Sequence, residues 1–159
     1  GMAHLFNYAG APWLTQKWVR KVKAAYSDVT PYGGYRDDED QGQMGALGVL
    51  MAIGLFEVDG GCAEKPFYEI TSPLFDKVTI HLDNRYYPGK TFQIITVGNS
   101  ADNMYIQRAS FNGKKWNKCW FYHEDFIKGG TLELQLGTTP NKKWGIEEFP
   151  PSSVSSDKD

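Results

Sequence analysis

The segment from Gly42 to Phe56 constrains the fold most, because it is apolar on every side and carries no charge between Asp40 and Glu57. A surface helix would show a single apolar stripe, whereas this pattern predicts a helix that is buried all round. The segment is shorter than the roughly 20 residues that a membrane-spanning helix needs. We therefore expect a core helix rather than a membrane span.

Four consecutive acids, Asp37 to Asp40, stand directly before this helix and follow the glycine pair Gly33-Gly34. Adjacent carboxylates repel one another, so their clustering needs a helix N-terminus, a cation or a water molecule to activate. The simplest interpretation is a solvated turn that caps the helix. An EF-hand loop starting at Asp37 is excluded, because its twelfth position is Gly48, where a bidentate glutamate is required.

The N-terminal third reads as helical. Residues 3–9 resemble the end of a helix that is broken at Gly10 and Pro12. From Pro12 to Tyr26 the spacing predicts an amphipathic helix with a basic outer face. Its predicted inward residues are Leu14, Trp18 and Val22.

The remainder of the chain has the alternating pattern of β-strands. Asn112-Gly113 predicts a hairpin turn, because both residues tolerate positive φ. Glu124 and Asp125 are expected to cap a single helical turn over 123–128. The predicted strands cover residues 67–70, 77–82, 91–97, 103–111 and 116–122 and the alternating leucines at 132, 134 and 136.

These patterns predict the α+β class, with N-terminal helices followed by an antiparallel β-sandwich-like region. The expected boundaries are residues 1–58 for the helical segment, 66–144 for the β region and 145–159 for a disordered tail. One amphipathic helix cannot surround a helix that is apolar all round. We therefore expect exposed apolar surface around Leu47 to Leu55, covered by self-association or by a missing helical partner.

Composition and charge argue against several classes of function. The net charge is −2 and the basic residues are scattered, so nothing indicates nucleic-acid binding. The first residues lack the pattern of a signal peptide. Cys62 and Cys119 have no metal-like spacing and could be free thiols or one bridge. His81 and His123 have no paired nucleophile or ligand motif and are interpreted as structural.

Several separated motifs, in a fixed order, resemble one family of glycosidases. The first are Leu5-Phe6-Asn7-Tyr8-Ala9-Gly10 with Pro12-Trp13, Thr15 to Arg20, and Asp38-Glu39-Asp40-Gln41-Gly42-Gln43-Met44. Ser72 to Val78, His123-Glu124-Asp125 and Lys128 to Glu133 follow. Together they resemble the C-terminal portion of glycoside hydrolase family 92, the calcium-dependent exo-acting α-mannosidases.

The resemblance implies a parent protein with an N-terminal β-sandwich, an (α/α)6 barrel that holds the active site, and C-terminal β-strands. Residues 1–58 would be the end of the barrel. The implied reaction is hydrolysis of terminal α-mannose from glycans, often α-1,2-linked as on N-glycans, with inversion of configuration. The implied cofactor is calcium, with most ligands outside this chain, and the implied location of the parent is periplasmic or secreted.

The family pattern Gly-Asp-Glu-Asp-Asn-Gly-Gln places its two aspartates on Asp38 and Asp40, which are the implied general-base candidates. The sequence departs from the pattern at Asp37, where glycine is expected, and at Gln41 and Gly45. The extra charge of Asp37 is expected to raise the pKa of the neighbouring base.

The spacing of the two aspartates limits their roles. An inverting glycosidase needs a base and an acid roughly 6.5–9.5 Å apart on opposite faces of the sugar. In an extended stretch Asp38 and Asp40 point to the same side, so both fit the water side. The resemblance implies a general acid upstream of this chain, and we expect the isolated chain to be inactive. The alternative is a non-catalytic remnant or a carbohydrate-associated β-sandwich module.

Overall fold

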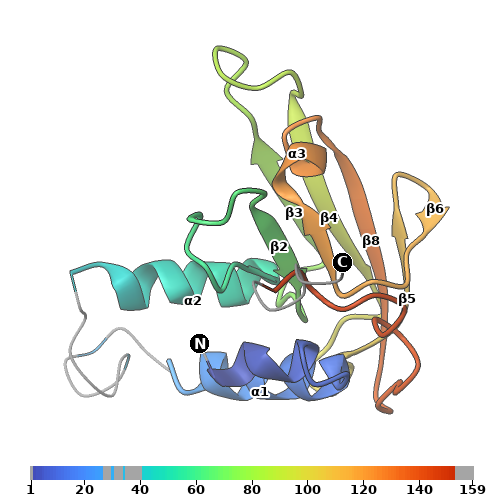
Figure 1. Cartoon of the computed structure of the whole chain (residues 1–159). Helices are drawn as coiled ribbons and strands as arrows, with labels where there is room; N and C mark the ends of the chain where they lie inside the picture. The colour runs from blue at the N-terminus through green and yellow to red at the C-terminus, as the bar shows by residue number, and fades with distance from the viewer. Residues whose placement is uncertain (1, 27–29, 31–33, 35–40, 153–159) are drawn as a thin grey trace.

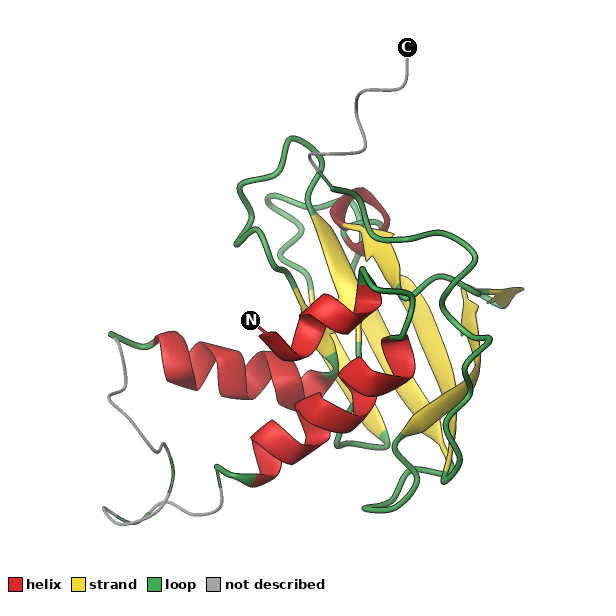
Figure 2. Ribbon diagram, turned by 60° about the horizontal axis from the view of Figure 1, so that its bottom comes forward, coloured by secondary structure: helices red, strands yellow, loops and turns green. Residues whose placement is uncertain are grey.

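The structure is a computed structural model that describes residues 2–26, 30, 34 and 41–152. The helical third comprises the 3-10 helix η1 (Met2–Asn7) and the helices α1 (Pro12–Ala24) and α2 (Gln43–Ile53). These helices lie together on one side of the β-strands (Figures 1 and 2). No helix in the described ranges is long and apolar enough to cross a bilayer.

The rest of the chain forms two sheets, which confirms the α+β class with a sandwich-like β region. The first sheet has the order β1-β2-β7 and is antiparallel throughout, and the second has the order β3-β4-β8-β5-β6. The first consists of β1 (Leu55–Phe56), β2 (Phe67–Ile70) and β7 (Trp120–Tyr122). The second consists of β3 (Lys77–His81), β4 (Thr91–Val97), β5 (Tyr105–Phe111), β6 (Lys114–Lys115) and β8 (Gly130–Gly137). The short helix α3 (His123–Phe126) follows β7.

The second sheet is not wholly antiparallel, which differs from the sequence-based expectation. Strand β8 pairs in parallel with β4, from Phe92 opposite Gly130 to Val97 opposite Gln135, and antiparallel with β5 on its other side. The reason is topological: the chain passes through β5, β6, β7 and α3 before β8 returns between β4 and β5. Alternation within a strand does not reveal the direction of its neighbours.

The expected strand over 116–122 is shorter in the structure, where Trp120–Tyr122 (β7) is its strand portion. Asn112 and Gly113 have positive φ, 50° and 77°, and form the predicted hairpin turn that leads into β6. Residues 116–119 then carry the chain to the other sheet, where β7 pairs with β2.

The core lies between the sheets. Its largest fully buried side chains include Phe67, Phe92 and Phe121, and Phe92 packs on Phe121 with ring centroids 5.6 Å apart. Cys119 is buried in the same core and Cys62 is exposed, and both are free thiols. The full set of buried core residues is Leu55, Phe67, Ile70, Phe92, Ile94, Ile106, Ala109, Phe111, Cys119, Trp120, Phe121, Leu132, Leu134, Leu136 and Trp144.

Helix α1 presents a different face to the protein from the one predicted. Trp18 and Val22 are 40% and 37% exposed, whereas Thr15, Gln16 and Val19 are buried. The cause is a backbone group of the sheet that needs a hydrogen-bond acceptor. Gln16 Oε1 accepts a hydrogen bond of 2.9 Å from the backbone N–H of Ile106. This N–H lies at the irregularity in the pairing of β5 with β8, and a buried N–H needs an acceptor.

Helix α2 is buried on one side only, so the expectation of burial all round is wrong. Gly48, Met51 and Ala52 are buried, while Val49 is 61% exposed. Exposed apolar side chains also occur on the neighbouring helical elements, at Leu5 and Trp18. Between Leu47 and Leu55 the exposed apolar side chain is thus Val49, and further exposed apolar side chains of the helical third lie on η1 and α1.

The segment after Trp144 packs against the protein as far as it is described. Ile146 forms a β-bridge with Lys118, and the indole N–H of Trp120 donates to the Glu148 carbonyl at 3.1 Å. A Cβ added at Gly10 would lie 3.4 Å from the ring of Phe149. Residues 145–152 thus differ from the expected disordered tail, and residues 153–159 lie outside the described residues.

Candidate functional site

The two general-base candidates, Asp38 and Asp40, lie outside the described residues, whereas both ends of the connection that carries them are described. Helix α1 ends near Tyr26, and the Tyr26 hydroxyl lies 4.0 Å from the sulfur of Met44 in the first turn of α2. A Cβ placed on Gly48 would lie 3.4 Å from the Tyr26 ring. The connection between the helices therefore starts and finishes at the same end of the α1–α2 pair.

The acids are followed at once by a helix N-terminus. Gln41 and Gly42 both have positive φ, 59° and 95°, and Gly42 is the residue that precedes α2. The amide groups of the first helical turn favour negative charge nearby. Glycine adopts a left-handed backbone without steric cost, and the motif places a glycine at the second of these two positions, Gly42.

The opposite end of α2 is fixed by the Ser72-Pro73-Leu74-Phe75 motif. The Leu74 N–H donates to the Ala52 carbonyl at 2.9 Å, and the Thr71 N–H donates to the Gly54 carbonyl at 2.8 Å. Gly54 has φ of 82°, and a Cβ at this residue would lie 2.5 Å from Pro73. The motif thus closes the C-terminus of the helix against the β region.

The same motif receives Arg20 from α1. Arg20 Nε donates to the Ser72 carbonyl at 3.1 Å and to Ser72 Oγ at 3.0 Å, and Nη2 donates to Asn99 Oδ1 at 2.6 Å and to the Pro73 carbonyl. Burial lowers the pKa of Arg20. One guanidinium therefore joins α1, the motif and the loop after β4. The motif's structural task, which is to hold both helices, was not evident from the sequence.

A buried polar cluster joins η1 to β2. Glu69 is fully buried, accepts a hydrogen bond from Asn7 Nδ2, and places Oε2 at 3.8 Å from His4 Nδ1. Burial raises the pKa of Glu69 to about 7 and lowers the pKa of His4 to about 3. His4 stacks on Phe56 with ring centroids 3.7 Å apart. Sequence reasoning missed this cluster, although Glu69 stands in phase with the inward Phe67.

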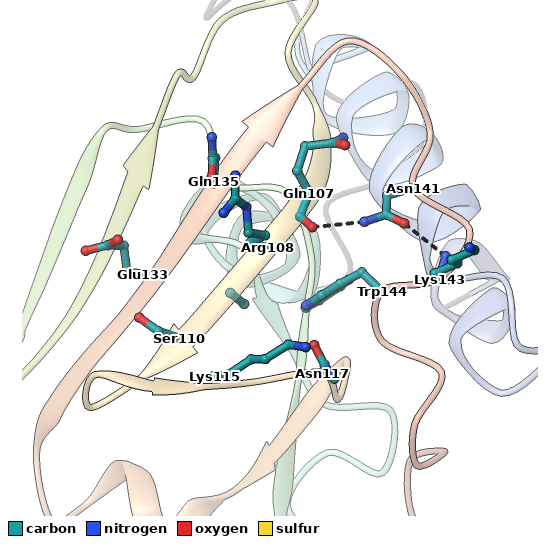
Figure 3. Close-up of a pocket in the computed structure, with 11 residues that line it drawn as sticks. Gln107, Arg108, Ser110, Lys115, Asn117, Glu133, Gln135, Asn141, Lys143 and Trp144 are labelled. Carbon is teal, nitrogen blue, oxygen red and sulfur yellow. Dashed lines mark hydrogen bonds between the residues drawn. The ribbon is translucent and has the colours of Figure 1, made fainter.

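A pocket of about 600 Å³ lies over β5, β6 and β8 (Figure 3). Most of its lining residues are polar, and they include three basic side chains, Arg108, Lys115 and Lys143, and one acid, Glu133. The remaining lining residues are Gln107, Ala109, Ser110, Asn117, Gln135, Asn141 and Trp144. The expectations from the sequence did not include this pocket.

A smaller pocket of about 220 Å³ is lined by Tyr122, His123 and Glu124 among others. His123 Nδ1 lies within hydrogen-bond distance of the Tyr68 hydroxyl, at 2.9 Å, and its ring packs beside Tyr87 and Phe126. Asp125 forms an ion pair of 3.1 Å with Lys128. His123 therefore has a structural partner.

Calcium has no visible donor set in the part of the chain that is described. In residues 2–26, 30, 34 and 41–152 no three His, Cys, Asp or Glu side chains are grouped so that they could hold a metal ion. Calcium prefers several oxygen ligands. The described residues therefore do not supply a calcium site by themselves.

Comparison with known proteins identifies a family. Residues 1–138 match the model of the glycosyl hydrolase family 92 catalytic domain. A protein of Arthroderma benhamiae named "Uncharacterized secreted glycosidase" is 36% identical over 153 residues, which are 93% of this chain and 19% of that protein.

Solved structures give the same result. A family GH92 α-mannosidase of Bacteroides thetaiotaomicron matches with a TM-score of 0.83 and 30% identity, over 95% of this chain and 20% of that chain. A family GH92 inverting mannosidase of the same organism matches with a TM-score of 0.82 and 36% identity, over 95% of this chain and 20% of that one. The first was also solved in complex with mannoimidazole. The chain thus spans about a fifth of the length of these relatives.

Proposed function

Because the chain belongs to glycosyl hydrolase family 92, we propose that it carries the water-activating part of an exo-acting α-mannosidase site. The observation that supports this most is the helix pair: α1 and α2 are held so that the acidic connection begins and ends at one end of them. The structural neighbours named as α-mannosidases, one of them complexed with mannoimidazole, support a terminal α-mannoside as the substrate.

In the proposed mechanism Asp38 and Asp40 act on the water side of the sugar. One carboxylate accepts the proton of the attacking water and the other orients that water, so that the anomeric carbon is inverted. The general acid that protonates the leaving oxygen comes from outside this chain. The related mannosidase named as inverting supports this stereochemistry.

Further parts of the proposal rest on the family. We expect calcium, held mostly by residues beyond this chain, and α-1,2-linked mannose of N-glycans as the substrate. The relative named as a secreted glycosidase supports a secreted or periplasmic parent protein. The alternative function, a non-catalytic remnant or a carbohydrate-associated β-sandwich module, predicts mannoside binding without turnover.

The test is a chimera in which this chain replaces the corresponding C-terminal fifth of the 36% identical inverting mannosidase. We expect the chimera to release mannose from α-1,2-mannobiose. Asp40→Asn and Asp38→Asn are each expected to lower kcat about 10²–10⁴-fold, because they remove a general base or its helper. Mannose release is measured with calcium and with a chelator.

The control variant is Glu39→Gln, which removes the adjacent acid to which the family pattern gives no base role. It is expected to keep activity within about tenfold of the unaltered chimera, since one step of general-base catalysis contributes more than that. A folded chimera in which Asp38→Asn and Asp40→Asn are as active as Glu39→Gln would refute the assignment. A folded but inactive chimera would favour the non-catalytic alternative.

The exposed apolar residues of the helical third give a second expectation. In the parent family we propose that Trp18, Val22 and Val49 pack against further barrel helices. In the isolated chain they are expected to promote self-association and the binding of a hydrophobic dye. Val49→Glu is expected to reduce both, and sedimentation velocity at several concentrations measures the first. A chain that stays monomeric at every concentration and binds no dye would contradict this.

A further inference from the structure

We propose that the pocket over β5, β6 and β8 binds an anionic carbohydrate, a sugar that carries a phosphate or a carboxylate. The pocket is defined by side chains that alternate outward from the second sheet: Arg108 from β5, and Glu133 and Gln135 from β8. Its lining residues all lie in the range 107–144, so it contains no residue of α1, α2 or the acidic connection. This site is thus additional to the proposed catalytic one.

Part of the pocket wall, at Gln107, Asn141 and Trp144, is held by hydrogen bonds within the protein. Asn141 Nδ2 donates to the Gln107 carbonyl at 2.9 Å, and the Lys143 N–H donates to Asn141 Oδ1 at 3.0 Å. The Trp144 indole N–H donates to the Trp116 carbonyl at 3.0 Å, and Trp144 is only 3% exposed. A shape that is already formed loses little entropy when a ligand binds.

The extra residue in β5 also shapes the wall. The pairing with β8 is irregular between Ile106 and Arg108, and the Gln107 side chain donates to the Tyr105 and Thr139 carbonyls at 3.0 and 2.8 Å. Gly137 stands beside it, since a Cβ there would lie 3.1 Å from the Gln107 side chain. The bulge thus ties the segment after β8 to the sheet and closes one side of the pocket.

Other lining side chains remain available to a ligand. Across the described ranges, the side chains of Arg108, Lys115 and Lys143 form no hydrogen bond or ion pair, and neither do those of Asn117 and Gln135. Amide side chains can both donate to and accept from sugar hydroxyls, and a guanidinium matches a carboxylate or phosphate in a two-bond geometry. The free groups therefore suit a hydroxylated anion.

The net positive charge of the lining favours an anionic ligand. Three basic side chains face one acid, although the whole chain has 17 basic and 19 acidic residues. Figure 3 shows the carboxylate of Glu133 pointing away from the side chains on β5, whereas Arg108 lies beside Gln135. The pocket is thus locally positive within an acidic chain.

The aromatic content argues against two other ligands. Single-stranded nucleic acids and many neutral glycans bind by stacking on exposed rings. Trp144, the aromatic residue of the lining, is almost completely buried and offers no open face. Recognition must therefore come from hydrogen bonds and charge. The choice of a carbohydrate rests on the proposed function, and the choice of an anion rests on the lining.

The test is titration of the purified chain with mannose 6-phosphate, glucuronic acid, mannose and inorganic phosphate at low salt, followed by amide NMR and calorimetry. At least one of the two anionic sugars is expected to bind ten times more tightly than mannose and than phosphate. Amide shifts are expected at residues 108–110, 115 and 135. The stronger of the two sugars identifies phosphate or carboxylate as the source of the charge.

Arg108→Gln is expected to weaken this binding at least tenfold, because it removes the charged fork while keeping hydrogen-bonding capacity. Lys77→Gln, on β3 of the same sheet and outside the pocket, is the matched control and should not change the affinity. Equal binding of phosphate or of mannose, shifts confined to other residues, or no binding at all would overturn the proposal. Because the readout involves no turnover, the result is independent of the chimera experiment.

Discussion

Replacing Gly54 with alanine is expected to lower the free energy of unfolding by at least about 3 kcal/mol. Gly54 ends helix α2 with φ of 82°, which costs an L-residue about 1–2 kcal/mol. The added Cβ would also lie 2.5 Å from Pro73 Cγ and 2.9 Å from the Pro73 backbone nitrogen. Neither group can move away cheaply, since Arg20 holds the Pro73 carbonyl. Urea unfolding followed by tryptophan fluorescence measures the loss.

Gly42 provides a matched control at the other end of the same helix. It also has a left-handed backbone, with φ of 95°, but a Cβ there would meet nothing within 4 Å. Gly42→Ala is therefore expected to cost only the backbone strain, about 1–2 kcal/mol. Equal losses for the two variants would show that contact with the Ser72-Pro73 motif does not fix the helix. In the chimera, Gly54→Ala should also reduce mannose release.

Replacing Glu69 with glutamine is expected to raise the free energy of unfolding at pH 8 by up to about 3 kcal/mol and to change it little at pH 4.5. Burial raises the pKa of Glu69 to about 7, so the folded state favours the protonated carboxyl. The stability that this provides is complete below pH 4.5 and is lost as the pH rises through about 7. Glutamine is neutral at every pH and can keep the bond from Asn7.

His4 acts in the opposite direction. Burial lowers its pKa to about 3, so the folded state favours the neutral imidazole. The stability that this lowered pKa provides is complete above pH 6.5 and is lost as the pH falls through about 3. Between pH 4.5 and 6.5 the two effects cancel, because folding transfers one proton from His4 to Glu69. The unaltered chain should therefore show little pH dependence from this pair in that window.

Each single variant makes the pH dependence of the remaining residue visible. In Glu69→Gln, stability should fall by about 1.4 kcal/mol per pH unit as the pH drops below 6.5. In His4→Gln, stability should fall by about the same slope as the pH rises from 4.5 to 7, on top of the lost stacking with Phe56. Urea midpoints at four pH values test both. If the two variants and the unaltered chain share one slope, the pair does not exchange a proton on folding.

The sequence could predict the elements, because alternation and helical spacing are local properties. The hairpin at Asn112-Gly113 and the strands over 67–70 and 91–97 follow from residue type alone. The family followed from motifs such as Asp38 to Met44, which the comparisons confirmed. The roles of Asp38 and Asp40 remain predictions.

What could not be predicted depends on distant partners. Gln16 is buried because the Ile106 N–H, 90 residues away, needs an acceptor, and this reverses the expected orientation of α1. Glu69 is buried because η1 covers it with Asn7 and His4. The polar pocket arises where the segment after β8 crosses the end of β5. Glu69 stands in phase with the inward Phe67, but neither the Gln16 contact nor the pocket leaves a periodic trace in the sequence.

The position of β8 in the middle of the second sheet also constrains the order of biosynthesis. On the ribosome, β3 and β4 emerge first as one hairpin and β5 and β6 later as another, and the strand that joins them comes last. Until residue 137 has been made, Ile94 and Ala109 each lack the neighbour that covers their strand edge. Folding from the N-terminus therefore cannot complete this sheet gradually. A nascent chain that stalls before β8 would expose two unpaired edges to other chains, and its release would be the step at which aggregation competes with folding.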